Sequence, residues 1–262
     1  MHETVLSALA DGVLTLTLTR PDKLNSFNDD MHRALRAGLE RAHDDAGVRA
    51  VLLTGTGRGF CAGQDLGDRD PAKGAPPPDL GRTLETFYNP NLRLIRSLEK
   101  PVVCAVNGVA AGAGANIALA CDIVLAAKSA KFIQAFAKIG LIPDAGGSWS
   151  LPRLVGEARA KALTLTAEPL PAEKAADWGL IWKAVEDADL MDQATALARS
   201  LAAGPTLGLG LTKRLIQAAA TNSLDEQLDM ERDCQQAAGR SADYAEGVAA
   251  FLEKRPATFQ GK

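Results

Sequence analysis

Short apolar runs that alternate with helical patterns recur along the first two thirds of the chain. Residues 49–55 (RAVLLTG), 101–108 (PVVCAVNG) and 121–127 (CDIVLAA) are rich in Val, Leu and Ile, and each predicts a short buried strand. Residues 28–45 and about 85–99 place apolar side chains at helical spacing. Repeated strand–helix–strand units predict a largely parallel sheet covered by helices, which is an α/β fold.

The two ends of the chain depart from this pattern. TVLSAL and VLTLTLTR alternate in polarity around Asp11-Gly12, which predicts an N-terminal β-hairpin. After about residue 157 the strand signals become rare, and three stretches have the pattern of amphipathic helices: 189–203, 206–220 and 224–238. We therefore divide the chain into a core, 1–188, and a helical C-terminal region, 189–262. The apolar stripes of that region fit either the core or a neighbouring subunit.

Charge excludes nucleic acid as an expected partner. The 262 residues carry a net charge of −3, and Lys and Arg are spread among Asp and Glu, so no basic face is available for a phosphate backbone. The four cysteines are widely spaced without a CxxC pair, and the three histidines all lie early in the chain. This spacing predicts no metal site and no Cys–His or Ser–His–Asp set.

The sequence also predicts a cytoplasmic protein without a membrane partner. Glu3 lies where a signal peptide carries positive charge, and the longest weakly polar run, 101–120, is interrupted by two asparagines and several glycines. Residues 67–82 are too rich in Pro, Gly and charge to form a packed element, so we expect a mobile loop beside a site.

Two glycine-rich stretches, 57–66 (GRGFCAGQDL) and 107–122 (NGVAAGAGANIALACD), follow predicted strands. Glycine there permits close approach of a ligand to the backbone, and the second stretch opens a helix whose free N–H groups favour negative charge. Two such donors from separate loops can form an oxyanion hole. The alternative is that these glycines only permit tight turns and close helix packing. Neither stretch matches a P-loop or the full GxGxxG pattern.

Five separated motifs resemble the enoyl-CoA hydratase/isomerase family, also called crotonases. They are GFCAGQDL, KPVVCAVNGVAAGAGA, ACDIVLAAKSAKF, IGLIPDAGG and SADYAEGVAAFLEKR, in the order and spacing of that family. The resemblance implies a crotonase fold, with repeated ββα units forming a core sheet and a helical C-terminal region that trimerises. It also implies an acyl-CoA thioester substrate, no metal or redox cofactor, and a homotrimer or dimer of trimers.

The resemblance further implies where the thioester binds. Its carbonyl would lie between the backbone N–H groups of Gln64 and Ala113, and Ala113 stands where many members have Gly. Coenzyme A contacts are implied for five residues: Lys23, Leu24, Ala62, Asp65 and Leu66.

One carboxylate distinguishes this chain from the family's hydratases. Hydratases of the family use two glutamates to add water. The corresponding positions here hold Asn116 and Phe136, and we expect both side chains to contact substrate. Asp144 stands where isomerases and a dehalogenase of the family carry an acid, and one carboxylate suffices to move a proton between two carbons. The alternative is that Asp144 is only a turn residue in Pro-Asp-x-Gly. We expect Phe136, Ile142 and Trp149 to bury its carboxyl and raise its pKa.

A narrower resemblance is to the ring-1,2-epoxyphenylacetyl-CoA isomerases of aerobic phenylacetate breakdown, carried by LNSFNDDMH, FYNPNLRLI, GLIPDAGGSWSLPR, PTLGLGLTK and AGRSADYAEGV. It implies conversion of 2-(1,2-epoxy-1,2-dihydrophenyl)acetyl-CoA to oxepin-CoA through an enolate and one proton-carrying Asp. It also implies that Phe87-Tyr88-Asn89-Pro90 lies in a helical roof over the acyl group, although core packing explains Phe87 equally well. Three alternatives remain: a Δ3,Δ2-enoyl-CoA isomerase acting on linear chains, an enoyl-CoA hydratase, and a catalytically silent acyl-CoA-binding or RNA-binding homologue.

Overall fold

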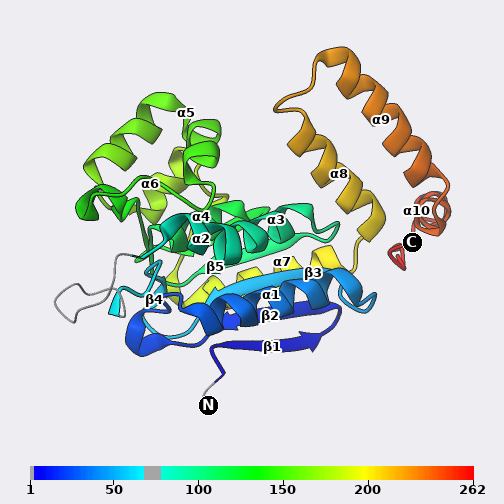
Figure 1. The fold of residues 1–262 in the computed structure, drawn as a ribbon. Helices are drawn as coiled ribbons and strands as arrows, with labels where there is room; N and C mark the ends of the chain where they lie inside the picture. The colour runs from blue at the N-terminus through cyan, green and yellow to red at the C-terminus, as the bar shows by residue number, and fades with distance from the viewer. Residues whose placement is uncertain (1–2, 68–77) are drawn as a thin grey trace.

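A six-stranded, mostly parallel sheet forms the centre of the molecule (Figure 1), seen in a computed structural model that describes residues 3–67 and 78–262. The strand order is β1-β2-β3-β5-β7-β10, and only the β1–β2 pair is antiparallel. The strands are β1 (Val5–Ala10), β2 (Val13–Leu18), β3 (Ala50–Gly55), β5 (Val102–Val106), β7 (Ile123–Ala127) and β10 (Lys183–Val185). The predicted strands and parallel sheet are confirmed.

The N-terminal hairpin and the first helix form for local reasons. Asp11 and Gly12 both have positive φ, 51° and 74°, as a two-residue turn between right-twisted strands requires. Helix α1 (Asp29–Asp44) begins at Asn28, whose side chain accepts a hydrogen bond from the Met31 amide at 3.0 Å. Its apolar face is buried against the sheet.

A second sheet of four short strands runs beside the first, in the order β4-β6-β8-β9. These strands are β4 (Gly59–Cys61), β6 (Val109–Ala111), β8 (Lys131–Ile133) and β9 (Leu170–Pro171). Each of β3, β5 and β7 leads into a short strand of this sheet and then into helical structure. The predicted repeat of ββα units is therefore confirmed.

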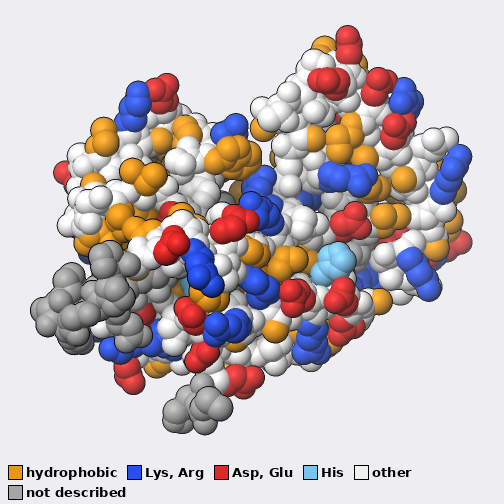
Figure 2. Space-filling view, in the orientation of Figure 1, with side chains coloured by type: hydrophobic (Ala, Val, Ile, Leu, Met, Phe, Trp, Pro, Cys, Tyr) orange, Lys and Arg blue, Asp and Glu red, His pale blue; other side chains and the backbone are white. Residues whose placement is uncertain are grey.

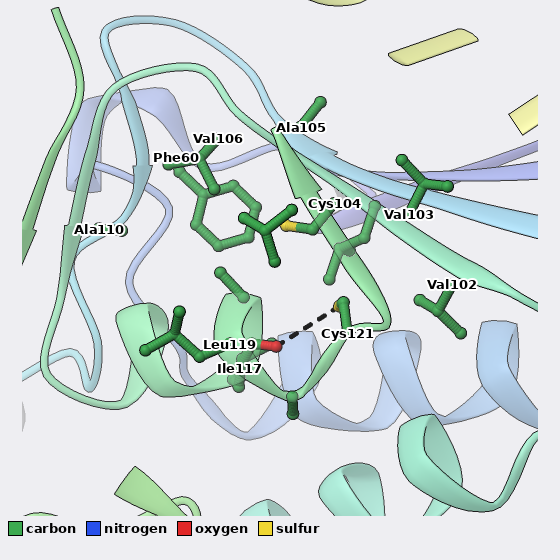
Figure 3. Close-up of a cluster of buried hydrophobic side chains, with 14 of the residues drawn as sticks. Phe60, Val102, Val103, Cys104, Ala105, Val106, Ala110, Ile117, Leu119 and Cys121 are labelled. Atoms are coloured by element: carbon green, nitrogen blue, oxygen red, sulfur yellow. Dashed lines mark hydrogen bonds between the residues drawn. The ribbon is translucent and has the colours of Figure 1, made fainter. Parts of the chain in front are cut away.

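One part of the core lies between the sheets and α4 (Ala113–Ala120), as Figure 3 shows. Phe60, Val106 and Ile117 are nearly without exposed surface. The four cysteines are buried and free, and burial raises the pKa of Cys61 to about 12. The thiols therefore pack as small apolar side chains.

The helical segments above the second sheet differ from the prediction in detail. The stretch expected as one helix from about 85 to 99 is α2 (Leu80–Thr83), a π-helical turn η4 (Leu84–Tyr88) and α3 (Asn89–Ser97). Of the predicted loop 67–82, residues 68–77 lie outside the described residues. The remaining elements of this part are η1 (Pro21–Lys23), η5 (Ala135–Ile139), α5 (Gly147–Thr166), α6 (Ala172–Asp177) and η6 (Asp187–Asp189).

Four helices complete the chain: α7 (Leu190–Ala202), α8 (Thr206–Ala218), α9 (Leu224–Gly239) and α10 (Ala242–Glu253). Helix α7 belongs to the packing of the core, because Ala194, Ala198 and Ala202 are buried in the core cluster. Helices α8 and α9 instead extend away from the sheet, on the far side of a gap from α5 (Figure 1). The boundary at 188/189 stays a prediction. None of the described helices combines the length and apolar character that crossing a membrane needs.

Candidate active site

A cavity of about 560 Å³ lies between the second sheet, the π-helical turn and the loop before α5. It brings together six of the residues expected at the site: Ala62, Gln64, Leu66, Ala113, Phe136 and Asp144. Among the described residues that line it, Asp144 is the one with a carboxylate. A mostly apolar cavity with a few converging polar groups is the usual form of a small-molecule site.

The direction of the Gln64 N–H is fixed through the Gly63 carbonyl, which belongs to the same peptide group. The amide nitrogen of Phe27 donates to the Gly63 carbonyl oxygen at 2.7 Å. Because a trans peptide is planar, the N–H of Gln64 points the opposite way from that carbonyl. Within the described residues this N–H donates no hydrogen bond to another protein group. It is therefore available to a ligand.

The N–H of Ala113 is the second available donor, at the first residue of α4. Gly112 precedes it with φ 53° and ψ −129°, a conformation open to glycine and strained for other residues. A Cβ on Gly63 would lie 3.5 Å from the Ala113 nitrogen, so the two glycine-rich loops meet closely. Two N–H groups from adjacent loops, one at a helix N-terminus, can stabilise a developing oxyanion.

Asp144 lies in a tight turn that is fixed through its backbone. Its carbonyl oxygen accepts hydrogen bonds from the Gly147 amide at 2.9 Å and from Asn116 Nδ2 at 2.8 Å. Ala145 follows with φ 47°, a left-handed conformation uncommon outside glycine. The turn holds the half-buried Asp144 side chain at the cavity, so its place in a turn does not prevent its carboxylate from facing a ligand.

Asn116, which we expected to contact substrate, instead supports this turn. It is 1% exposed and does not line the cavity. Its Oδ1 accepts a hydrogen bond from Gln134 Nε2 at 2.9 Å, which fixes the amide so that Nδ2 faces the Asp144 carbonyl. A Cβ on Gly147 would lie 2.3 Å from that nitrogen, so only glycine fits there. The sequence held no signal for Gln134, because its role depends on a partner in another element.

Apolar side chains form the remaining wall. The Phe136 ring lies beside Gly112, next to the available Ala113 N–H, since a Cβ on Gly112 would be 3.7 Å from its Cζ. Ile139, Leu141 and Ile142 line the cavity yet remain exposed, which marks the mouth. The expectation that Trp149 covers Asp144 is wrong, because this side chain packs against the guanidinium groups of Arg96 and Arg153, away from the cavity.

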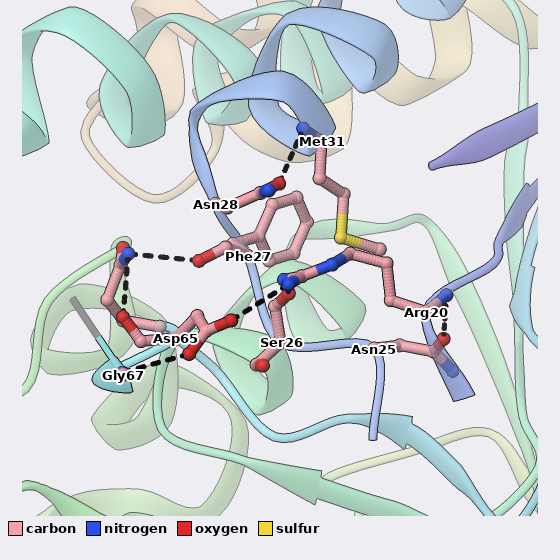
Figure 4. Close-up of polar contacts among 9 residues, drawn as sticks. Arg20, Asn25, Ser26, Phe27, Asn28, Met31, Asp65 and Gly67 are labelled. Carbon is pink, nitrogen blue, oxygen red and sulfur yellow. Dashed lines mark hydrogen bonds and ion pairs between the residues drawn. The ribbon is translucent and has the colours of Figure 1, made fainter. Parts of the chain in front are cut away.

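Three expected coenzyme A contacts do not line the cavity: Lys23, Leu24 and Asp65. Asp65 forms an ion pair with Arg20 at 2.9 Å and accepts a hydrogen bond from the Gly67 amide at 3.0 Å (Figure 4). Burial tends to raise the pKa of Asp65, but the Gly67 amide and Arg20 outweigh it and hold the pKa below its usual value. Asp65 therefore stabilises the loop that carries Gln64.

No group of three or more His, Cys, Asp or Glu side chains within residues 3–67 and 78–262 could hold a metal ion. Tyr88 also lines the cavity, from the end of the π-helical turn, and its hydroxyl donates to Gln64 Oε1 at 3.0 Å. We expected Tyr88 in a helical roof over the acyl group, and its place in the cavity lining agrees with that expectation, whereas its hydrogen bond to Gln64 was not expected.

Comparison with known proteins identifies the family. Residues 9–262 match the family model "Enoyl-CoA hydratase/isomerase". The chain is 59% identical over 262 residues to the 1,2-epoxyphenylacetyl-CoA isomerase of Escherichia coli (strain K12), covering 100% of both proteins. It is 34% identical over 258 residues to a trans-2-decenoyl-[acyl-carrier-protein] isomerase of Streptococcus mutans, covering 98% of each.

The fold agrees with this match. The crystal structure of an enoyl-CoA hydratase from Bacillus anthracis superimposes with a TM-score of 0.93 at 31% sequence identity, over 99% of this chain and 100% of that chain. The predicted crotonase fold is thereby confirmed. The chain belongs to the enoyl-CoA hydratase/isomerase family.

Proposed function

We propose that the protein is an acyl-CoA isomerase that converts 2-(1,2-epoxy-1,2-dihydrophenyl)acetyl-CoA to oxepin-CoA in aerobic phenylacetate catabolism. The observation that carries the proposal is a cavity in which Asp144 is the one carboxylate among the described lining residues and in which Gln64 and Ala113 offer two available N–H donors. The 59% identity to the E. coli isomerase over the whole chain supports the choice of substrate.

The reaction needs only groups that the cavity offers. The thioester oxygen would accept hydrogen bonds from the N–H groups of Gln64 and Ala113, which stabilise the enolate formed when Asp144 removes a proton from the adjacent CH2 group. Asp144 would return a proton to a ring carbon, while the bond between the two epoxide carbons opens and the ring widens to seven members. One proton leaves and one returns, so the conversion consumes no redox cofactor.

Hydration of an enoyl-CoA is disfavoured at this site. Water addition in this family relies on two carboxylates, and the corresponding positions hold the buried Asn116 and the Phe136 ring. Transposition of a double bond in a linear 3-enoyl-CoA needs the same groups as the ring reaction, so it remains the second candidate.

The test compares kcat/KM for three thioesters under one set of conditions: the ring epoxide, a linear 3-enoyl-CoA and crotonyl-CoA. We expect isomerisation of the ring epoxide to be fastest and hydration of crotonyl-CoA slowest. Preference for the linear 3-enoyl-CoA would keep the mechanism and replace the substrate. Efficient hydration of crotonyl-CoA would overturn the proposal.

We also propose that the enzyme works as a trimer or a dimer of trimers. Helices α8 to α10 carry large apolar side chains on their surface: Ile216, Leu224, Leu228, Phe251 and Leu252. Orange patches over α8 and α9 are visible beside the hollow that separates them from α5 (Figure 2). Surface of this kind indicates association with another chain.

Coenzyme A would enter past the exposed residues of the mouth. Ala62 and Leu66 line the cavity and are retained as proposed contacts. Lys23 and Leu24 lie outside the cavity, and Lys23 is in an exposed turn. Their contacts with coenzyme A stay predictions.

A further inference from the structure

The roof of the cavity is the π-helical turn η4 with the residues on either side of it. Leu80, Thr83, Leu84 and Tyr88 from this segment all line the cavity. A π-helical turn is rare, and it occurs most often where a helix serves a binding or catalytic site. The acyl group of a bound thioester would therefore contact this segment.

Tyr88 connects the roof to the loop that carries the Gln64 donor. The Tyr88 hydroxyl donates to Gln64 Oε1 at 3.0 Å, and Gln64 Nε2 donates to the Phe27 carbonyl oxygen at 2.9 Å. The Gln64 side chain is thus held at both ends of its amide. Because the Phe27 amide also binds the Gly63 carbonyl oxygen, one short segment fixes both the side chain and the peptide plane of Gln64.

Aromatic packing restricts where Tyr88 can place its hydroxyl. The His32 ring stacks on Phe27 at 4.5 Å and meets Tyr88 edge-on at 4.3 Å between centroids. On its other side, His32 stacks on Phe87 at 5.2 Å. Phe27, His32 and Tyr88 are at most 2% exposed. Rings packed this closely have little freedom to rotate, so the hydroxyl position follows the backbone of the roof.

Helix α1 anchors the roof itself. Arg36 Nη2 donates to the Thr86 carbonyl oxygen at 2.6 Å, and Arg36 Nε donates to Asn91 Oδ1 at 3.2 Å. Asn91 Nδ2 in turn donates to the His32 carbonyl oxygen at 3.2 Å. The Arg36 guanidinium therefore holds the π-helical turn in place through its backbone. The turn, the aromatic rings and Gln64 form one connected network of contacts.

We propose that Tyr88 is a positioning residue, which through the Gln64 side chain sets the direction of the Gln64 N–H toward the thioester oxygen. The inference rests on the proposed oxyanion hole and adds a residue that does not touch the reacting atoms. Tyr88 thereby couples the fit of the acyl group under the roof to polarisation of the thioester carbonyl.

The test uses Tyr88→Phe and Gln64→Met, each of which removes one side of the hydrogen bond and keeps the backbone. Tyr244→Phe is the matched control, because Tyr244 is the other tyrosine of the chain and lies exposed on α10. Phenylacetyl-CoA labelled with 13C at the thioester carbonyl serves as a probe that lacks the epoxide. The frequency of its bound carbonyl stretch reports hydrogen bonding in the oxyanion hole without turnover.

We expect the carbonyl stretch of the bound probe to lie higher in Tyr88→Phe than in the wild-type enzyme, and to be unchanged in Tyr244→Phe. We expect kcat for the ring epoxide to fall about tenfold in Tyr88→Phe with KM nearly constant, less than the effect of deleting an oxyanion donor. Since Tyr88 acts through Gln64, the variant that combines Tyr88→Phe with Gln64→Met should lose no more kcat than the single variant with the larger loss.

Two results would overturn the inference. One is an unchanged carbonyl frequency in Tyr88→Phe, and the other is a double variant whose loss equals the product of the two single losses. Failure of the proposed oxyanion hole has a separate signature: the carbonyl frequency of the probe bound to wild-type enzyme would then match that of the free thioester.

Discussion

Asn116 and Gln134 act on the backbone of Asp144 at the scale of single residues. Both are nearly without exposed surface, and together they bring one amide N–H to the Asp144 carbonyl oxygen at 2.8 Å. Asn116 thus holds the turn that carries Asp144. Proton transfer requires that the carboxylate stay within hydrogen-bond reach of the carbon it serves.

Replacement of Asn116 by Asp should therefore slow the reaction. The variant keeps the shape of the side chain but removes the N–H donor and places a carboxylate against a carbonyl oxygen. We expect kcat to fall about tenfold or more, since small misplacement of a reacting group costs that much. The free energy of unfolding should fall by about 1–3 kcal/mol. Steady-state kinetics and urea unfolding measure both, and wild-type kcat in a folded variant would contradict this role.

The Arg20–Asp65 pair predicts a pH dependence of stability. The pKa of Asp65 is depressed in the folded protein, so its stabilising contribution is present above the unfolded value of about 3.9 and is lost as pH falls through the lower folded value. We expect Asp65→Asn to remove this part of the acid-induced loss. Urea unfolding at several pH values below 5 measures it, and parallel profiles of the two proteins would refute the assignment.

Elements of secondary structure were predicted from sequence to different degrees. The hairpin, α1 and the long strands were found because their patterns of apolar residues are local. The repeated ββα units came from family resemblance, but the residues of the second sheet were not assigned from the sequence, since its strands span only two or three residues and pair through the backbone with distant strands. The proposed oxyanion donors and the place of Tyr88 in the roof came from family resemblance, whereas the Tyr88–Gln64 bond and the role of Gln134 could not be found, because each depends on a contact between separate elements.

The start of α8 is tied to the core and to the C-terminal tail by one side chain. Arg49 donates to Thr206 Oγ1 at 2.9 Å, to the Gly204 carbonyl oxygen at 2.5 Å and to the Phe259 carbonyl oxygen at 2.9 Å. We expect Arg49→Ala to lower the free energy of unfolding by about 2 kcal/mol, and Arg49→Lys to lower it less. Denaturant unfolding measures both, and wild-type stability of the Ala variant would show that these bonds contribute nothing.

Exposed apolar side chains on the C-terminal helices predict that chains of this protein associate in solution. Phe251 is 83% exposed and Leu224 is 74% exposed, both in helices that extend away from the sheet. We expect multi-angle light scattering at micromolar concentration to give the mass of a trimer or hexamer, and Phe251→Asp to shift the mass toward the monomer. A stable wild-type monomer would contradict the proposed assembly.

Asp144→Asn tests the central claim, that one carboxylate carries the proton in this cavity. Asn keeps the turn, and Asp11→Asn, in the hairpin turn with φ 51°, is the matched control away from the site. The account predicts that the Asp144 variant folds and binds phenylacetyl-CoA like the wild type, yet turns over the ring epoxide at least ~100-fold more slowly, while the control keeps wild-type turnover. A folded Asp144→Asn enzyme with near wild-type turnover would contradict it.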